Sequence, residues 1–93
     1  MVTNELLAEF KNRMRIFHNA EDDNLRVILA GSLSAVEDMV GSNDINDSSV
    51  KELVLERSRY VYNDSLEYFA DNFKDEIARV SLRLTLGGAS DKS

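Results

Sequence analysis

Apolar residues recur at spacings of three and four along most of this chain, a pattern that is typical of amphipathic helices. The first such stretch predicts a helix over residues 4–14. Its apolar face is made of Leu6, Leu7, Phe10 and Met14. We expect Thr3 to cap its start, because a threonine hydroxyl can accept a hydrogen bond from a free backbone N–H.

A second helix is expected to begin after Asn19 and to end before Gly41. Asn19 is the predicted N-cap, and the acidic residues 21–23 suit the positive end of a helix dipole. Gly41 can adopt the left-handed conformation that often follows a helix. The predicted buried stripe consists of Leu25, Ile28, Leu29, Ser32, Val36, Met39 and Val40.

A loop of Gly, Ser, Asn and Asp over residues 41–47 leads into a long third helix. Ser49 and Glu52 have the spacing of a capping box at its start. Both Asn63-Asp64 and Asp71-Asn72 can end this helix, since their side chains compete for the backbone, and we place the break at the second pair. Its broad inner face is predicted to hold Val50, Leu53, Val54, Arg57, Val61, Ser65, Tyr68 and Phe69.

A last helix follows and is expected to end at Gly87-Gly88. Its inner face is predicted to hold Phe73, Ile77, Val80 and Leu84. The segment 81–86 alternates briefly and is also compatible with a short strand. The pattern thus predicts an all-α fold, a small bundle of about four helices with a long third helix. One helical domain over residues 1–88 would carry a flexible tail, residues 89–93.

The composition is acidic: among 93 residues, 17 are Asp or Glu and 11 are Lys or Arg, a formal net charge of −6. This balance disfavours a DNA-reading surface, which needs clustered cations. The longest uncharged run, 27–36, is about half of the roughly twenty apolar residues that a membrane span requires. The start lacks the basic and apolar segments of a secretion signal, so we expect a soluble intracellular protein.

The chain offers little material for catalysis. It has no Cys and a single histidine, His18, which we expect to be a loop residue rather than a general base or a metal ligand. The segment 44–48 opens like a calcium loop but lacks the glycine and glutamate that complete one. No glycine-rich phosphate loop is present. We therefore predict no enzyme, no metal and no cofactor.

One short motif has a covalent alternative. Asp64-Ser65-Leu66 matches the tripeptide on which acyl carrier proteins bear phosphopantetheine. Those proteins are also small, acidic and helical, but their serine lies near mid-chain at the start of a helix. Here Ser65 falls inside an expected helix and only 28 residues follow it. The carrier function is therefore the least favoured alternative.

The tyrosines suggest a protein contact. All three lie between residues 60 and 68, and Tyr60 and Tyr62 diverge by about 200° on a helix, so both cannot face one core. At least one is expected to be exposed or buried against another subunit. Small residues in the second helix would also let another backbone approach closely. They are Ala30, Gly31, Ser32 and Ala35.

The order of these signals resembles the small head–tail connector proteins of tailed bacteriophages, also called adaptor or DNA-packaging proteins. The resemblance covers roughly residues 6–86. It is carried by Leu6–Ile16, the acidic start Glu21–Leu25, the helix end Val36–Gly41, the segment Glu56–Phe69, Asn72-Phe73 and Leu82–Leu84. The chain is at the short end for this family, with a compact loop over residues 42–47.

The resemblance implies a structural role in the virion neck, with the host cytoplasm as the place of assembly. Such proteins bind the portal protein, form a ring of about a dozen copies that extends the DNA channel, and present a docking surface for a tail-completion or stopper protein. DNA would pass without sequence-specific binding. On this basis Gly31, Ser32, Ala35, Tyr60 and Tyr62 are candidate subunit contacts. Arg83, Leu84 and Leu86 are candidates for contact with the portal.

Overall fold

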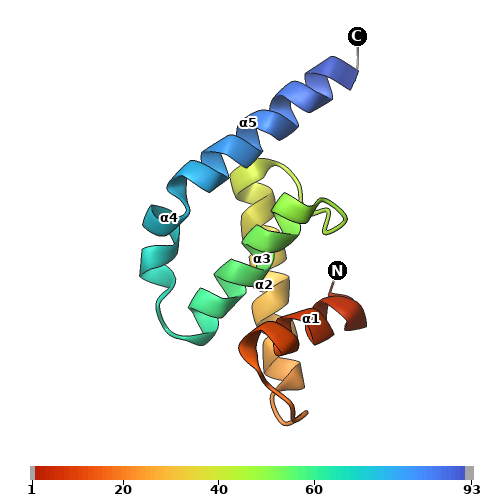
Figure 1. Ribbon diagram of the computed structural model, residues 1–93, viewed down its shortest axis with the longest axis vertical. Helices are drawn as coiled ribbons and strands as arrows, with labels where there is room; N and C mark the ends of the chain where they lie inside the picture. Colours follow the sequence, from red (N-terminus) through yellow and green to blue (C-terminus); the bar gives the residue numbers. More distant parts are fainter. Residues whose placement is uncertain (1, 92–93) are drawn as a thin grey trace.

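The computed structural model describes residues 2–91, and the side chains of residues 2–86, and these residues form helices joined by short loops (Figure 1). The elements are α1 (Asn4–Met14), α2 (Asp22–Val40), α3 (Ser48–Tyr62), the 3-10 helix η1 (Leu66–Tyr68), α4 (Phe69–Asn72) and α5 (Lys74–Asp91). The all-α prediction is confirmed, with five α-helices in the described residues instead of about four.

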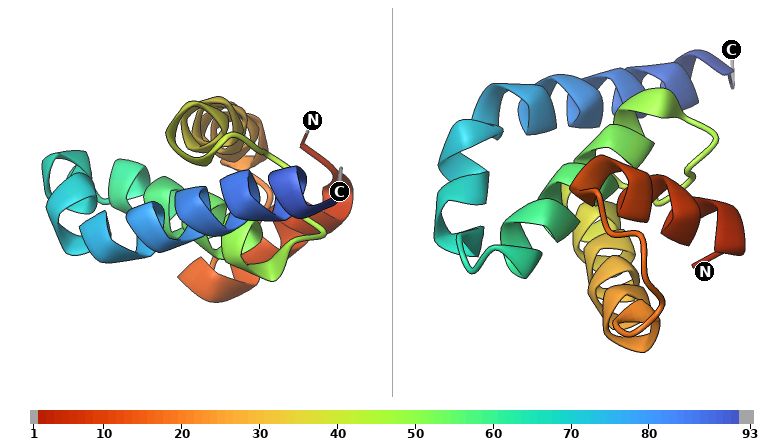
Figure 2. Two further views of the ribbon diagram at one scale, coloured as in Figure 1. Left: turned by 90° about the horizontal axis from the view of Figure 1, so that it is seen from above. Right: turned by 60° about the horizontal axis from the view of Figure 1, so that its bottom comes forward.

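Helix α2 is the centre of the fold. Its most extensive contact is with α3, which crosses it obliquely, while α1 crosses its first half and α5 crosses its last turns (Figures 1 and 2). The buried apolar residues form one cluster at these crossings. They are Leu6, Leu7, Phe10, Ile16, Leu25, Leu29, Leu33, Val36, Val40, Val50, Leu53, Val54, Leu55, Phe69 and Val80. Leu33 and Leu55 belong to this core although the predicted apolar faces did not include them.

The start of the chain follows the prediction closely. Helix α1 has the expected bounds, and the Thr3 hydroxyl accepts a hydrogen bond from the Leu6 N–H at 3.0 Å. Gly41 follows α2 with a φ of 87°, as expected. The predicted cap at Asn19 is wrong, because α2 begins at Asp22 and the Asn19 side chain instead accepts a hydrogen bond from Lys11.

The capping box predicted for α3 is also wrong. The cap is Asp47, whose carboxylate accepts hydrogen bonds from the N–H groups of Ser49 and Val50 at 2.9 and 3.2 Å. Glu52 is not available to complete a box, because its carboxylate binds Arg13.

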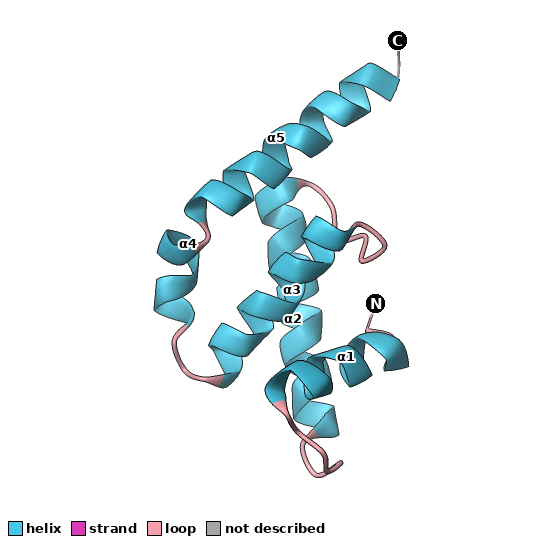
Figure 3. Cartoon of the chain, viewed as in Figure 1, coloured by secondary structure: helices cyan, strands magenta, loops and turns pink. Residues whose placement is uncertain are grey.

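The long third helix of the prediction is divided in two. Helix α3 ends at Tyr62, and Asp64 then takes a left-handed conformation with a φ of 56° (Figure 3). This reversal lets the chain fold back so that Phe69 is buried in the core, whereas Tyr68, expected on the inner face, is 60% exposed. The break expected at Asp71-Asn72 exists as well, as the short turn at Phe73 between α4 and α5.

Helix α5 continues further than predicted. Val80 is buried and Ile77 and Leu84 pack against the core, as expected, but residues 81–86 are helical rather than a strand. The helix also passes through Gly87-Gly88 to Asp91. Glycine lowers helix stability by about 1 kcal/mol without forbidding the conformation. Of the predicted tail, residues 89–91 belong to this helix, and Lys92 and Ser93 lie outside the described residues.

Candidate interaction surfaces

The structure places His18 in the exposed loop between α1 and α2. Its Nδ1 accepts a hydrogen bond from the Ala20 N–H at 3.2 Å, and its Nε2 lies 3.9 Å from a Glu21 oxygen. Within residues 2–91, no three His, Cys, Asp or Glu side chains are arranged to hold a metal ion. The part of the chain that the structure describes also contains no helix long and apolar enough to cross a membrane.

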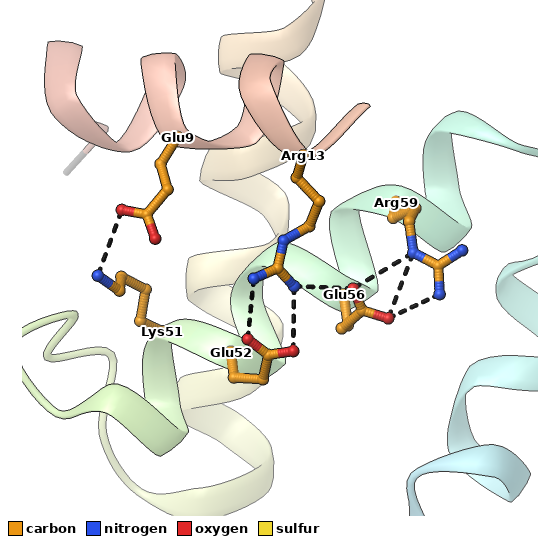
Figure 4. A network of polar contacts seen from close by, with 6 residues as sticks. All are labelled: Glu9, Arg13, Lys51, Glu52, Glu56 and Arg59. Carbon is orange, nitrogen blue, oxygen red and sulfur yellow. Dashed lines mark hydrogen bonds and ion pairs between the residues drawn. The ribbon is translucent and has the colours of Figure 1, made fainter. Parts of the chain in front are cut away.

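A pocket of about 260 Å³ lies between the start of α1 and the α2–α3 loop. Its lining residues are Thr3, Glu5, Leu6, Glu9, Ile45, Asn46 and Lys51. Two of them, Glu9 and Lys51, form an ion pair at 3.2 Å (Figure 4). The volume is below the roughly 300–1,000 Å³ of ordinary ligand pockets, so this hollow is a weak candidate for small-molecule binding.

Ser65 lies outside the helices, contrary to the expectation that it falls within one. It immediately precedes η1, and its hydroxyl donates a hydrogen bond to the Tyr60 carbonyl at 3.4 Å. The helical segment that follows is short, because η1 and α4 together end at Asn72. The start of a helix is the position that a carrier serine requires, so the placement of Ser65 by itself no longer argues against that alternative.

Tyr60 and Tyr62 point in different directions, as their spacing predicts, but each meets a neighbouring element of the same chain. The Tyr60 ring makes edge-to-face contacts with Phe69 and Phe73, at centroid distances of 5.6 and 5.8 Å. The Tyr62 hydroxyl donates to Glu21 at 2.8 Å, and this hydrogen bond raises the pKa of Tyr62. Both rings are half-buried, so much of their surface is used within the chain.

The small residues of α2 lie on different faces. Ser32 is fully buried, and its hydroxyl is hydrogen bonded to the Ser58 hydroxyl at 2.8 Å and accepts from Arg57 at 3.2 Å. It therefore serves the contact between α2 and α3. Ala35 is half-buried, whereas Gly31 is exposed, and a Cβ built there would meet no atom within 4 Å. Gly31 and the exposed Ala30 are thus the members of the set that face outward.

The candidate residues of α5 also divide between the inside and the outside. Leu84 packs against the core, and Arg83 donates to both carboxylate oxygens of Asp47, at 3.0 and 2.9 Å. Burial raises the pKa of Asp47, but the Arg83 hydrogen bond and the two backbone N–H groups outweigh this, so its pKa lies below the ordinary value. Leu86 is 56% exposed, next to Leu82 at 60%.

An ion-pair network joins α1 to α3 (Figure 4). Arg13 donates to both oxygens of Glu52, at 2.9 and 3.0 Å, and to Glu56 at 2.8 Å. Arg59 binds Glu56 from the other side at 2.7 Å. Burial raises the pKa of Glu56, but the hydrogen bonds from Arg59 and Arg13 outweigh it and hold this pKa below its ordinary value. The sequence does contain a signal for this network, since two acids four residues apart on a helix repel each other without a cation.

Comparisons with protein-family models, with curated proteins and with solved structures found no match to this chain.

Proposed function

We propose that this chain is a head-completion protein of a tailed bacteriophage, a connector that binds the portal and forms a ring extending the DNA channel. The ring would also provide the docking surface for a tail-completion or stopper protein. The resemblance described above, which covers roughly residues 6–86, is the origin of this proposal. The all-α fold is compatible with it.

The observation that best supports a binding role is the outer side of α5. Leu82 and Leu86 are more than half exposed there, whereas Val80, on the other side of the same helix, is fully buried in the core. Large apolar side chains gathered on one exposed helix face are typical of protein contacts.

The charge of the protein supports the same role. With a net charge of −6, the surface repels DNA phosphates, and this would favour passage of DNA over binding to the ring. The expected affinity for DNA is therefore weak at all salt concentrations. A DNA-binding regulator would instead lose affinity steeply as salt rises.

The decisive experiment is electron microscopy of particles made by a phage with a stop codon early in this gene. The connector proposal expects DNA-filled or leaking heads lying apart from finished tails. Supplying the wild-type gene from a plasmid is the control and should restore joined virions. Normal virions without the protein would contradict the proposal and favour a small helical regulator instead.

The carrier alternative has its own test, because Ser65 begins a helical segment. The intact protein is treated with a phosphopantetheinyl transferase and coenzyme A, and its mass is measured, with Ser65→Ala as the control. We expect no gain of mass. A gain of one phosphopantetheine that Ser65→Ala abolishes would replace the connector proposal with a carrier function.

A further inference from the structure

Over residues 77–86 the outer face of α5 is apolar and basic, whereas the first turn of the helix carries the acids Asp75 and Glu76. Val80, Ile77 and Leu84 face the core, while Leu82 and Leu86 lie one turn apart on the opposite side. Arg79 is exposed in the same stripe, and its partner within the chain is the exposed pair with Glu76, three residues earlier. Between residues 77 and 86 the helix carries two arginines and no acid.

The outer face of α2 has the complementary character. Over residues 30–38 its exposed residues are small or acidic: Ala30, Gly31, Ser34, Glu37 and Asp38. Val27 precedes them on the same face and is 69% exposed. The last turn of α2 carries no basic residue, so its two acids add to the negative end of the helix dipole. This end of α2 therefore attracts cations from outside the chain.

Gly31 is unexplained by the contacts of its own chain. It lies in the middle of a 19-residue helix, where glycine costs about 1 kcal/mol relative to alanine. Its φ is not positive, and an added Cβ would meet no atom within 4 Å. A missing side chain at an exposed helical position does allow another helix to approach closely.

We propose that the outer face of α5 in one copy packs against the outer face of α2 in a second copy. Leu82 and Leu86 would lie over Ser34 and Gly31, and Arg79 would lie beside Asp38, with the two helices antiparallel. In a single copy, α2 lies on one side of α3 and α5 (Figure 2). Both faces therefore stay free in the same molecule, and the contact is head-to-tail, the kind that repeats to close a ring.

This contact rests on the proposed function, because it names the surfaces by which the ring would assemble. It also assigns the end of α5 to a second copy rather than to the portal. Among the candidate residues of the sequence, it retains Gly31 and Leu86. Ser32, Leu84 and the two tyrosines contact their own chain.

Engineered disulfides test the contact directly, since the chain has no cysteine. Ser34→Cys and Leu82→Cys are made as separate variants, and each is oxidised with copper phenanthroline alone and in an equal mixture. A disulfide requires Cα atoms about 4.4–6.8 Å apart. We expect a crosslinked dimer in the mixture and none in either variant alone, because a head-to-tail contact does not bring a position against itself. Absence of the mixed dimer would overturn the proposal.

A steric variant provides a second measurement. Gly31→Leu should fold at least as stably as the wild type by circular dichroism, yet should lose self-association in sedimentation velocity. Phe17→Ser is the matched control, because it removes an 82% exposed ring outside the proposed contact and should leave association unchanged. Association of Gly31→Leu like that of wild type, or a wild-type protein that is monomeric at every concentration, would overturn the contact. Separated heads and tails in the stop-codon particles would still support the connector itself.

Discussion

Replacing Tyr60 with alanine distinguishes a residue of the fold from a residue of a subunit interface. An interface tyrosine can be removed without changing the stability of the monomer, and the candidate role of Tyr60 as a subunit contact predicts that outcome. In the structure, however, Tyr60 joins the end of α3 to the return through α4, because its ring meets both Phe69 and Phe73, which are themselves stacked at 4.9 Å. Its hydroxyl also accepts a hydrogen bond from Asn72 at 3.0 Å.

The expected cost follows from these contacts. Truncating a fully buried large aromatic residue costs about 3–5 kcal/mol, and each aromatic pair contributes about 0.5–1.5 kcal/mol. Because Tyr60 is only half-buried, we expect Tyr60→Ala to lower the free energy of unfolding by about 2–3 kcal/mol. A domain of this length has about 5–14 kcal/mol in total, so the loss is large.

Urea unfolding followed by far-ultraviolet circular dichroism measures this difference. Tyr60→Phe is the control: it keeps both ring contacts and loses an exposed hydrogen bond, so its unfolding free energy should stay within about 0.5 kcal/mol of wild type. If Tyr60→Ala unfolds at the same urea concentration as wild type, the packing of Tyr60 on Phe69 and Phe73 does not stabilise the fold and the reasoning fails.

Three further predictions concern the helices and their ion pairs. Gly31→Ala should raise the free energy of unfolding by up to about 1 kcal/mol, because alanine favours a helix more than glycine does. In calorimetry this gain raises the melting temperature by roughly 4–8 °C. A lower melting temperature would contradict the exposed helical position of Gly31. Asp47→Ala should lower the free energy of unfolding, measured in urea, by about 1–2 kcal/mol, because it removes the cap of α3. Asp47→Asn keeps a capping oxygen and loses only the charge that pairs with Arg83. Equal stability of the wild type and both variants would argue against this cap. The pKa of Glu56 is lowered in the folded state, so its stabilising contribution is present above its ordinary pKa of 4.5 and is lost as the pH falls below it. Between neutral pH and pH about 3, the Glu56→Gln variant should therefore lose less unfolding free energy than the wild type does. A pH profile like that of the wild type would contradict the ion-pair assignment.

The network around Glu56 explains how a thin core holds α1 in place. Helix α1 buries Leu6, Leu7 and Phe10, and the edge of this buried face is tied to α3 by Arg13 and by the Glu9–Lys51 pair. Such partly exposed pairs contribute little individually. Their effect is to set the orientation of α1, because two separate pairs on one helix fix its rotation as well as its position.

Local features of the sequence were sufficient where one helix carries its own signals. The bounds of α1 follow from the spacing of Leu6, Phe10 and Met14 and from the hydroxyl of Thr3, and the end of α2 follows from Gly41. These signals lie within a few residues of the element they define. Amphipathic periodicity also predicted correctly which face of α5 meets the core, because Ile77, Val80 and Leu84 recur at spacings of three and four.

Tertiary contacts decided the features for which the chain holds two equivalent local options. Asn63-Asp64 and Asp71-Asn72 are equally weak helix formers, and the first pair ends α3 because the reversal buries Phe69 against Tyr60. Asp47 caps α3 and is held by Arg83, 36 residues away in sequence, while Glu52 is held by Arg13, 39 residues away. Each outcome depends on a partner that is distant along the chain, and the local pattern of residues does not identify that partner. The inward position of Ser32 was predicted from the periodicity of α2, but its partners Arg57 and Ser58 on α3 are known only from the folded structure.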